Sequence, residues 1–144
     1  MADKSSSRQG GTPRNDKGKQ HPLPAMNLVF VYGTLKRGGS NHHLMAGQKF
    51  LGAARTPPGF RLYDLGGHPG MIPKTDDRAG IFGEVWSVDV ACLAQLDLLE
   101  GTAQGIYRRV PVRLLPPYAD QPVETYLYAQ SVAGRPDIGS IWRE

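Results

Sequence analysis

Apolar residues in this chain gather into short runs separated by loops, a pattern that is typical of β-strands. The runs predict strands at residues 28–32, 49–55, 60–65, 80–87, 106–115 and 123–130. Loops rich in proline and glycine separate them, at residues 57–59, 66–67, 69–70 and 116–117. A weak helical pattern covers residues 41–46. Strands therefore dominate the predicted structure.

One segment has the clear periodicity of a helix. Residues 89–100 place Leu96 and Glu100 four positions apart on one stripe. Asp89 is suited to cap the start of this helix, and Gly101 follows its last residue as a C-cap. With the predicted strands, this helix indicates an α+β fold: a mixed, barrel-like β-sheet with one principal helix.

The first strand runs into a turn that is suited to bind a ligand through its backbone. Residues 29–31 are β-branched or aromatic, which is typical of a strand covered on both faces. Gly33 lets the main chain approach a ligand closely, and Thr34, Gly38 and Gly39 leave N–H groups free for an anion such as a carboxylate. Two glycine motifs bind nucleotide phosphates after a strand, G-x-x-x-x-G-K-[ST] and G-x-G-x-x-G. Neither follows this strand, which argues against nucleotide binding through these motifs. The alternative is an ordinary glycine turn after a core strand.

Glu100 occupies an unfavourable position for a carboxylate. It continues the apolar stripe of the helix and stands at the C-terminal end, where the helix dipole is negative. Burial would raise its pKa, and Asp97 one turn earlier would act in the same direction if it lies close. A carboxyl group with a raised pKa is suited to proton transfer near neutral pH. The alternative is a surface glutamate in a frayed last turn.

Three segments together resemble the gamma-glutamylcyclotransferase-like (AIG2-like) family, and within it most closely the gamma-glutamylamine cyclotransferase branch. The segments are Tyr32-Gly33-Thr34-Leu35, Leu96-Asp97-Leu98-Leu99-Glu100-Gly101 and Tyr107-Arg108-Arg109. The resemblance extends over residues 26–130. It implies the same barrel-like fold, a turn at Tyr32, Gly33, Thr34 and Leu35 that holds the glutamyl or 5-oxoproline part of the ligand, and Glu100 as the catalytic acid/base.

The implied substrate is a small γ-glutamyl amide. Its α-amine attacks its own γ-carbonyl, closes 5-oxoproline and expels an amine, so the reaction requires no cofactor and no covalent enzyme intermediate. Tyr32 and Tyr107 are predicted as walls or hydrogen-bond partners of this substrate, or simply as half-buried core. The alternatives to an enzyme are a non-catalytic γ-glutamyl or small-acid binding module and an adaptor that works through a basic tail.

Other chemistry has weaker support in the sequence. Cys92 is the only cysteine, has no flanking base and is interpreted as a small core residue. His42 and His43 are adjacent and therefore diverge, so no metal site is predicted. No serine stands in a nucleophile-elbow motif, which argues against a serine hydrolase.

The basic residues are unevenly distributed along the 144 residues. Residues 1–25 hold almost no apolar side chains, carry +3 of the formal charge of +4, and are predicted to be a disordered basic tail. Residues 26–144 form the predicted domain, which is near neutral; this argues against nucleic-acid binding by the domain. The sequence has no apolar stretch typical of a membrane span or signal peptide, and one cysteine fits a cytoplasmic protein. It carries no signal for an oligomeric state.

Two further expectations concern the surroundings of the site. The loop at residues 66–77 and the C-terminal residues 131–144 are predicted to form the rim that meets the leaving amine. Glu84, inside a predicted strand, is expected to face solvent or to pair with an arginine across the sheet.

Overall fold

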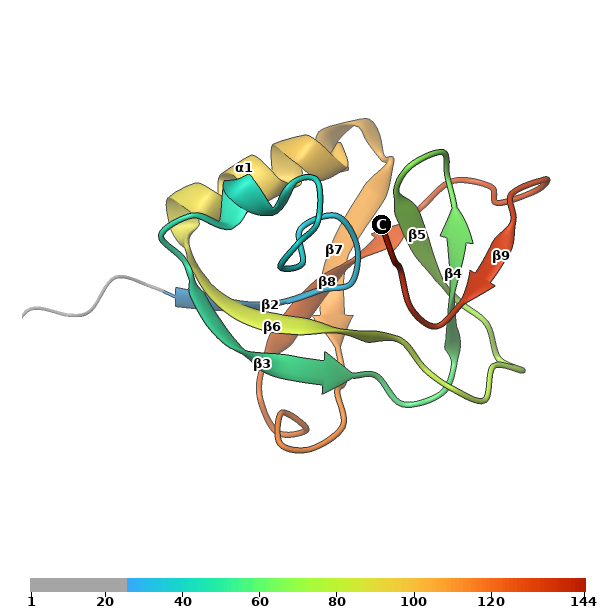
Figure 1. Ribbon diagram of the computed structural model, residues 1–144, viewed down its shortest axis with the longest axis horizontal. Helices are drawn as coiled ribbons and strands as arrows, with labels where there is room; N and C mark the ends of the chain where they lie inside the picture. The colour runs from blue at the N-terminus through green and yellow to red at the C-terminus, as the bar shows by residue number, and fades with distance from the viewer. Residues whose placement is uncertain (1–25) are drawn as a thin grey trace, which may run out of the picture.

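A computed structural model describes residues 26–144, so the predicted tail at residues 1–25 lies outside the described residues. The domain consists of two sheets and one α-helix (Figure 1). The larger sheet has the order β3-β6-β2-β8-β7, with bounds Lys49–Arg55, Phe82–Asp89, Met26–Val31, Val123–Tyr128 and Tyr107–Val112. The smaller sheet has the order β5-β4-β9, with bounds Pro69–Pro73, Phe60–Asp64 and Asp137–Gly139.

Strand β2 lies at the centre of the larger sheet and is buried on both faces, as its continuous apolar run predicts. It pairs antiparallel with β6 and parallel with β8, which makes the sheet mixed. Successive side chains of a strand point to opposite faces. Val29 therefore packs in the cluster that contains Leu96, while Phe30 packs with Leu62 and Met71 of the smaller sheet.

Helix α1 (Val90–Glu100) covers one face of the larger sheet and has the predicted caps. The Asp89 carboxylate accepts a hydrogen bond of 2.8 Å from the Cys92 N–H. Gly101 adopts the left-handed conformation at φ +64°, and its N–H bonds back to the last turn. Short 3₁₀ helices stand at His42–Met45, where the weak helical pattern lies, and at Thr102–Gln104. No helix within residues 26–144 is long and apolar enough to cross a membrane.

The α+β class, the mixed sheet and the single principal helix are confirmed, but the sheet does not close into a barrel. Strand β5 lies where the sequence predicts the loop at residues 66–77, so that part of the prediction is wrong. Pro69 begins β5, which is an edge strand, and proline is tolerated there because no ladder N–H is required of it. The three-residue strand β9 is too short to give a sequence pattern.

The expectation that Glu84 faces solvent or pairs across the sheet is corrected by the structure. Glu84 is 8% exposed, and its carboxylate accepts hydrogen bonds from the Arg37 main-chain N–H at 3.0 Å and the Trp86 indole at 3.1 Å. Its partner is an arginine, with Arg37 Nε at 3.1 Å, but this arginine belongs to the turn that follows β2. Glu84 therefore ties that turn to β6.

Candidate active site

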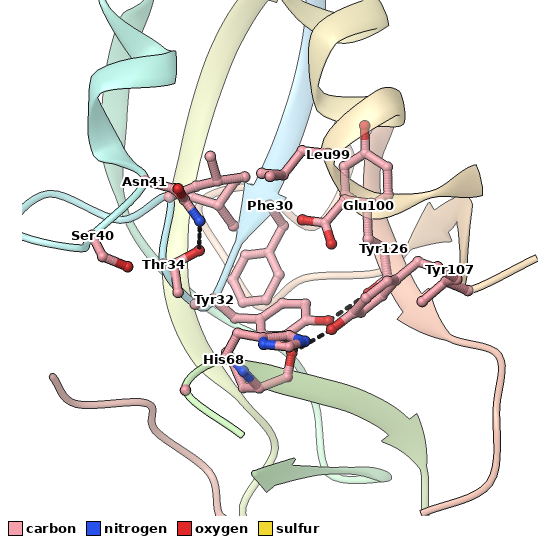
Figure 2. A pocket seen from close by; sticks show the side chains of 16 residues that line it. Phe30, Tyr32, Thr34, Ser40, Asn41, His68, Leu99, Glu100, Tyr107 and Tyr126 are labelled. Carbon is pink, nitrogen blue, oxygen red and sulfur yellow. Dashed lines mark hydrogen bonds between the residues drawn. The ribbon is translucent and has the colours of Figure 1, made fainter. Parts of the chain in front are cut away.

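A cavity of about 320 Å³ opens where the end of β2, the end of α1 and the starts of β5 and β7 meet (Figure 2). The residues predicted to bind or act on the substrate line it: Tyr32, Gly33, Thr34, Leu35, Glu100 and Tyr107. The expectation that Gly38 and Gly39 also offer free N–H groups to an anion is wrong, because neither lines the cavity and the Gly39 N–H donates to Lys36 O at 2.8 Å. Glu100 lies 65 positions after Leu35 in the chain, and Tyr107 lies 75 positions after Tyr32. The fold therefore gathers the proposed substrate-binding and catalytic positions around one space.

The turn after β2 presents unpaired backbone donors at this cavity. Its carbonyls are used internally, since Lys36 N–H donates to Gly33 O at 3.1 Å and Asn41 N–H to Thr34 O at 2.9 Å. The Asn41 side chain also donates to Thr34 Oγ1 at 3.0 Å. By contrast, the N–H groups of residues 33–35 make no hydrogen bond to any residue within 26–144. Consecutive free N–H groups of this kind form a binding site for an anionic oxygen.

Gly33 is required for a contact that the sequence did not reveal. A Cβ at this position would stand 2.7 Å from Pro69 Cγ and 2.9 Å from Pro69 Cδ, closer than side-chain carbons pack. The sequence predicts that Gly33 lets the main chain approach a ligand closely, and that stays a prediction. The structure adds that Gly33 lets the turn pack against the proline ring that begins β5. The position of the turn thus depends on Gly33 through Pro69.

Glu100 ends α1, and its side chain is half-buried. Figure 2 shows its carboxylate projecting into the cavity, with Thr34 and Asn41 on the other side of the space. The carboxylate has no hydrogen bond or ion pair with any residue in the described part of the chain. Desolvation by burial raises the pKa of Glu100 from its usual 4.5 to about 7. The cavity thus holds a carboxyl group that exchanges a proton near neutral pH.

Asp97 does not add to this shift, contrary to the expectation from the sequence. Its carboxylate is held by Arg109, with Nε at 3.0 Å and Nη2 at 3.2 Å, and accepts a hydrogen bond of 2.7 Å from the Tyr126 hydroxyl. Arg109 also bonds Glu124 at 2.6 Å. The neighbouring cation offsets the charge of Asp97, and burial alone accounts for the raised pKa of Glu100.

Tyr32 and Tyr107 form walls of the cavity and use their hydroxyls to join the two sheets. The Tyr32 hydroxyl donates to Tyr126 O at 2.6 Å and accepts from the Met71 N–H at 3.2 Å. The Tyr107 hydroxyl donates to Pro69 O at 2.8 Å. Burial is the main reason that the pKa values of both phenols are well above their usual range, so both stay protonated. Their protons are therefore already committed to backbone carbonyls.

Comparisons with known proteins identify the family of this chain. A family model described as gamma-glutamyl cyclotransferase, AIG2-like, matches residues 29–143. The chain belongs to this family. The match includes every residue named above as lining the cavity, and it continues to residue 143, beyond residues 26–130 that carry the resemblance in sequence.

Individual relatives support the assignment to the AIG2-like family. The gamma-glutamylcyclotransferase family protein YtfP of Escherichia coli is 35% identical over 106 residues, covering 74% of this chain and 86% of that protein. A Vibrio cholerae relative is 47% identical over 74 residues, which is 51% of this chain and 62% of the relative. The crystal structure of a mouse AIG2-like protein superposes with a TM-score of 0.63 at 27% identity, covering 80% of this chain and 87% of that one. The chain spans half of the length of a matched Arabidopsis thaliana relative.

The rim of the cavity only partly follows the expectation. Gly67, His68 and Pro69 of the first predicted rim segment line the cavity. No residue of the second segment, residues 131–144, does so. Its last residue instead supports the turn, because the Glu144 carboxylate accepts a hydrogen bond from the Ser40 N–H at 3.1 Å.

Phe30 and Leu99 also line the cavity and stand in segments that the sequence marks, although no role at the site was predicted for them. Further lining residues carry no signal in the sequence that would have marked them: Ser40, Asn41, Ile106 and Tyr126. Two other sequence interpretations concern residues outside the cavity lining. Cys92 is buried with its thiol 3.7 Å from Leu44 O, in keeping with a core residue. The His42 ring bonds Leu35 O at 3.0 Å, and within residues 26–144 no cluster of His, Cys, Asp and Glu is arranged to hold a metal ion.

Removal of the Tyr32 hydroxyl is expected to destabilise the AIG2-like domain. Tyr32→Phe would leave the buried Tyr126 carbonyl without its donor and the Met71 N–H without its acceptor, at a cost of about 1 to 2 kcal/mol in the free energy of unfolding. Denaturant melts would measure the loss. Tyr63→Phe is the control, because the Tyr63 hydroxyl bonds no described residue. Equal losses in both variants would show that the Tyr32 bonds contribute nothing specific.

Proposed function

We propose that this chain is a gamma-glutamyl cyclotransferase that converts a γ-glutamyl amide to 5-oxoproline and a free amine. The observation that carries the proposal is the unpaired Glu100 carboxyl, with a pKa of about 7, across one cavity from the free N–H groups of residues 33–35. Membership of the gamma-glutamyl cyclotransferase, AIG2-like family supports it. The reaction requires a proton carrier beside a site for an anionic oxygen; Glu100 is suited to the first role and the free N–H groups to the second.

The proposed steps begin with a proton transfer from the substrate α-ammonium to the Glu100 carboxylate. The freed α-amine attacks the γ-carbonyl carbon, forming the ring C–N bond and placing negative charge on the carbonyl oxygen. Glu100 then passes its proton to the leaving nitrogen as the amide C–N bond breaks. The ring nitrogen releases a second proton, which ends on the departing amine. The products are 5-oxoproline and an alkylammonium ion, and Glu100 is again a carboxylate.

The turn and the tyrosines orient the substrate in this scheme. The N–H groups of residues 33–35 hold either the α-carboxylate or the oxyanion that develops from the γ-carbonyl. Tyr32 and Tyr107 enclose the folded glutamyl chain, and their committed hydroxyls keep both rings in place. A substrate held in the ring-closing shape reacts faster because the nucleophile is already positioned.

The deciding experiment is an assay of 5-oxoproline release over a panel of γ-glutamyl amines, γ-glutamyl amino acids and glutathione. Release from at least one of these classes supports the cyclotransferase. A protein that binds 5-oxoproline in isothermal titration but releases none from any compound would instead be the γ-glutamyl or small-acid binding module. Full turnover in a variant without the Glu100 carboxylate would keep the reaction and reject the mechanism.

The pH dependence of turnover gives a second expected result. Glu100 must be a carboxylate to accept the α-ammonium proton, and its pKa is about 7. We therefore expect kcat/KM to rise about tenfold per pH unit below this pKa and to level off above it. A pH profile of 5-oxoproline release from pH 5 to 9 measures this. An acid limb centred near the ordinary glutamate pKa would contradict the role of a buried Glu100.

A further inference from the structure

The turn with the free N–H groups is held in place by a buried carboxylate outside the cavity. Glu84 of β6 is buried and does not line the cavity. Its Oε1 accepts hydrogen bonds from the Arg37 main-chain N–H at 3.0 Å and from the Trp86 indole at 3.1 Å. Arg37 stands two residues after Leu35, the last of the three free N–H positions. Glu84 therefore fixes the main chain just beyond the proposed anion site.

A histidine fixes Leu35 itself. The His42 ring bonds Leu35 O at 3.0 Å, and because a carbonyl only accepts, Nδ1 carries the hydrogen. This ring also packs edge-on against Trp86, with 5.4 Å between the ring centroids. The N–H of the same peptide unit, that of Lys36, donates to Gly33 O at 3.1 Å. The peptide unit after Leu35 is thus bonded at both ends, so it cannot rotate without losing a hydrogen bond.

The charge of Glu84 does not itself favour an anion at the turn. A carboxylate so close to an anion site repels the ligand, and here a cation offsets that repulsion. Arg37 Nε lies 3.1 Å from Glu84 Oε2, and the guanidinium carbon lies 3.8 Å from the centroid of the Phe50 ring. Phe50 in turn packs edge-on against Trp86 at 5.4 Å. Any benefit of Glu84 to anion binding must therefore come from the hydrogen bonds that it accepts.

We propose that Glu84 and His42 are positioning residues for the anion site, linked to each other by Trp86. Glu84 acts through Arg37 and His42 acts through Leu35, and neither positioning residue touches the substrate. Together they keep the three free N–H groups directed at the cavity before a ligand arrives, which reduces the cost of ordering the site on binding. The inference rests on the proposed function, since 5-oxoproline is the ligand that probes the site.

Two nearly isosteric variants of Glu84 separate its hydrogen bonds from its charge. Glu84→Gln and Glu84→Met both remove the negative charge, but only glutamine keeps an oxygen that accepts from Arg37 and Trp86. We expect Glu84→Met to raise the Kd of 5-oxoproline at least about tenfold, because displaced binding groups lose much of their effect. Glu84→Gln should bind as tightly as wild type or more tightly. Isothermal titration measures both values.

Asp77→Leu is the matched control for lost stability. The Asp77 carboxylate is also buried and accepts main-chain hydrogen bonds, from Gly59 at 3.0 Å and from Gly80 at 2.8 Å, but this loop does not line the cavity. Asp77→Leu should therefore lower the melting temperature, as Glu84→Met does, and leave the Kd of 5-oxoproline unchanged.

A second pair of variants tests the histidine. His42→Phe keeps an aromatic ring beside Trp86 but removes the donor to Leu35 O, so the Kd of 5-oxoproline should rise about three- to tenfold. His43→Phe is the control, because His43 is exposed in the same 3₁₀ helix and its ring bonds no described residue. It should leave the Kd unchanged.

The amide NMR signals of residues 33–35 give a readout that general destabilisation does not move. In wild type, 5-oxoproline should shift these signals. Glu84→Met and His42→Phe should change them in the free protein, because the orientation of the peptide units changes. Asp77→Leu and His43→Phe should leave them in their wild-type positions.

The outcomes separate this proposal from the proposed function. If wild type does not bind 5-oxoproline, or binds it without shifting the amide signals of residues 33–35, the positioning proposal is overturned, and release of 5-oxoproline judges the cyclotransferase separately. Binding by Glu84→Met that matches wild type or Glu84→Gln rejects the role of Glu84. If Glu84→Met does not fold, His42→Phe and His43→Phe decide in its place, and equal Kd values for these two reject the proposal. If the expected binding pattern holds while no γ-glutamyl compound releases 5-oxoproline, the positioning proposal stands and the cyclotransferase fails.

Discussion

Glu100→Gln is expected to reduce the turnover of γ-glutamyl substrates by a factor of about 10² to 10⁴, the usual loss when an acid/base group is removed. Glutamine keeps the shape of the side chain and its capacity for hydrogen bonds, but it accepts no proton from the α-ammonium. Binding of 5-oxoproline should persist, because the N–H groups of residues 33–35 and the tyrosine walls are untouched. Turnover and isothermal titration on the same preparation measure the two effects.

The same substitution should change stability in a pH-dependent way. The pKa of Glu100 is about 7 in the folded protein against 4.5 for an ordinary glutamate, so the folded state keeps a proton that the unfolded state releases between these values. Stability of wild type therefore falls as pH rises through this interval. The loss is at most about 3 kcal/mol, and less to the extent that solvent reaches the half-buried carboxylate. Glutamine carries no such penalty.

Thermal melts at several pH values test this directly. Glu100→Gln should be more stable than wild type at pH 8, and the two proteins should converge below about pH 4.5, where Glu100 is protonated in both states. Asp120→Asn is a control that also removes one negative charge, at an exposed position outside the cavity. It should change neither turnover nor the pH dependence of stability. An active Glu100→Gln protein would reject Glu100 as the proton carrier.

The elements that the sequence predicts well are those with local signals. The run at residues 29–31 is apolar on both faces because β2 is the central strand of its sheet. Asp89 and Gly101 mark the two ends of α1 because capping depends on groups within a few residues. Strand β5 was missed because Pro69 and Gly70 are loop residues by local criteria. They form a strand only through pairing with β4 and packing against Tyr128.

The candidate site shows the same division between features with a local sequence signal and features that depend on residues distant in the chain. Glu100 and the turn at residues 32–35 are recognisable because each has an unusual local position or motif. The partner of Asp97 was not predictable in this way, since Arg109 reaches it from β7 and Tyr126 from β8. Local spacing showed that Asp97 lies one turn from Glu100, but the effect of its charge depended on those distant groups. The roles assigned to the lining residues stay predictions.

Gly33→Val is expected to weaken 5-oxoproline binding by about 100-fold, or about 3 kcal/mol. The new Cβ would stand within 3 Å of Cγ and Cδ of Pro69. These atoms belong to the pyrrolidine ring, which is closed on the main-chain nitrogen, so they cannot rotate away as a free side chain could. Overpacking of this kind also lowers the free energy of unfolding by about 1 to 3 kcal/mol. Isothermal titration and denaturant melts measure both losses. Thr34→Ser is the control, because serine keeps an oxygen that accepts the hydrogen bond from Asn41.

A double-mutant cycle determines whether the collision with Pro69 causes these losses. Pro69→Ala removes the Cγ and Cδ atoms that the new Cβ would meet. If the collision is the cause, Gly33→Ala should weaken binding and stability in the wild-type background and do so much less beside Pro69→Ala, with a coupling free energy of about 0.5 to 3 kcal/mol. Additive losses would mean that Gly33 is needed for the approach of the ligand itself, as the sequence alone indicated. In that case the N–H groups of the turn would contact the ligand beside a position where any Cβ intrudes, and β5 would have no part in placing them.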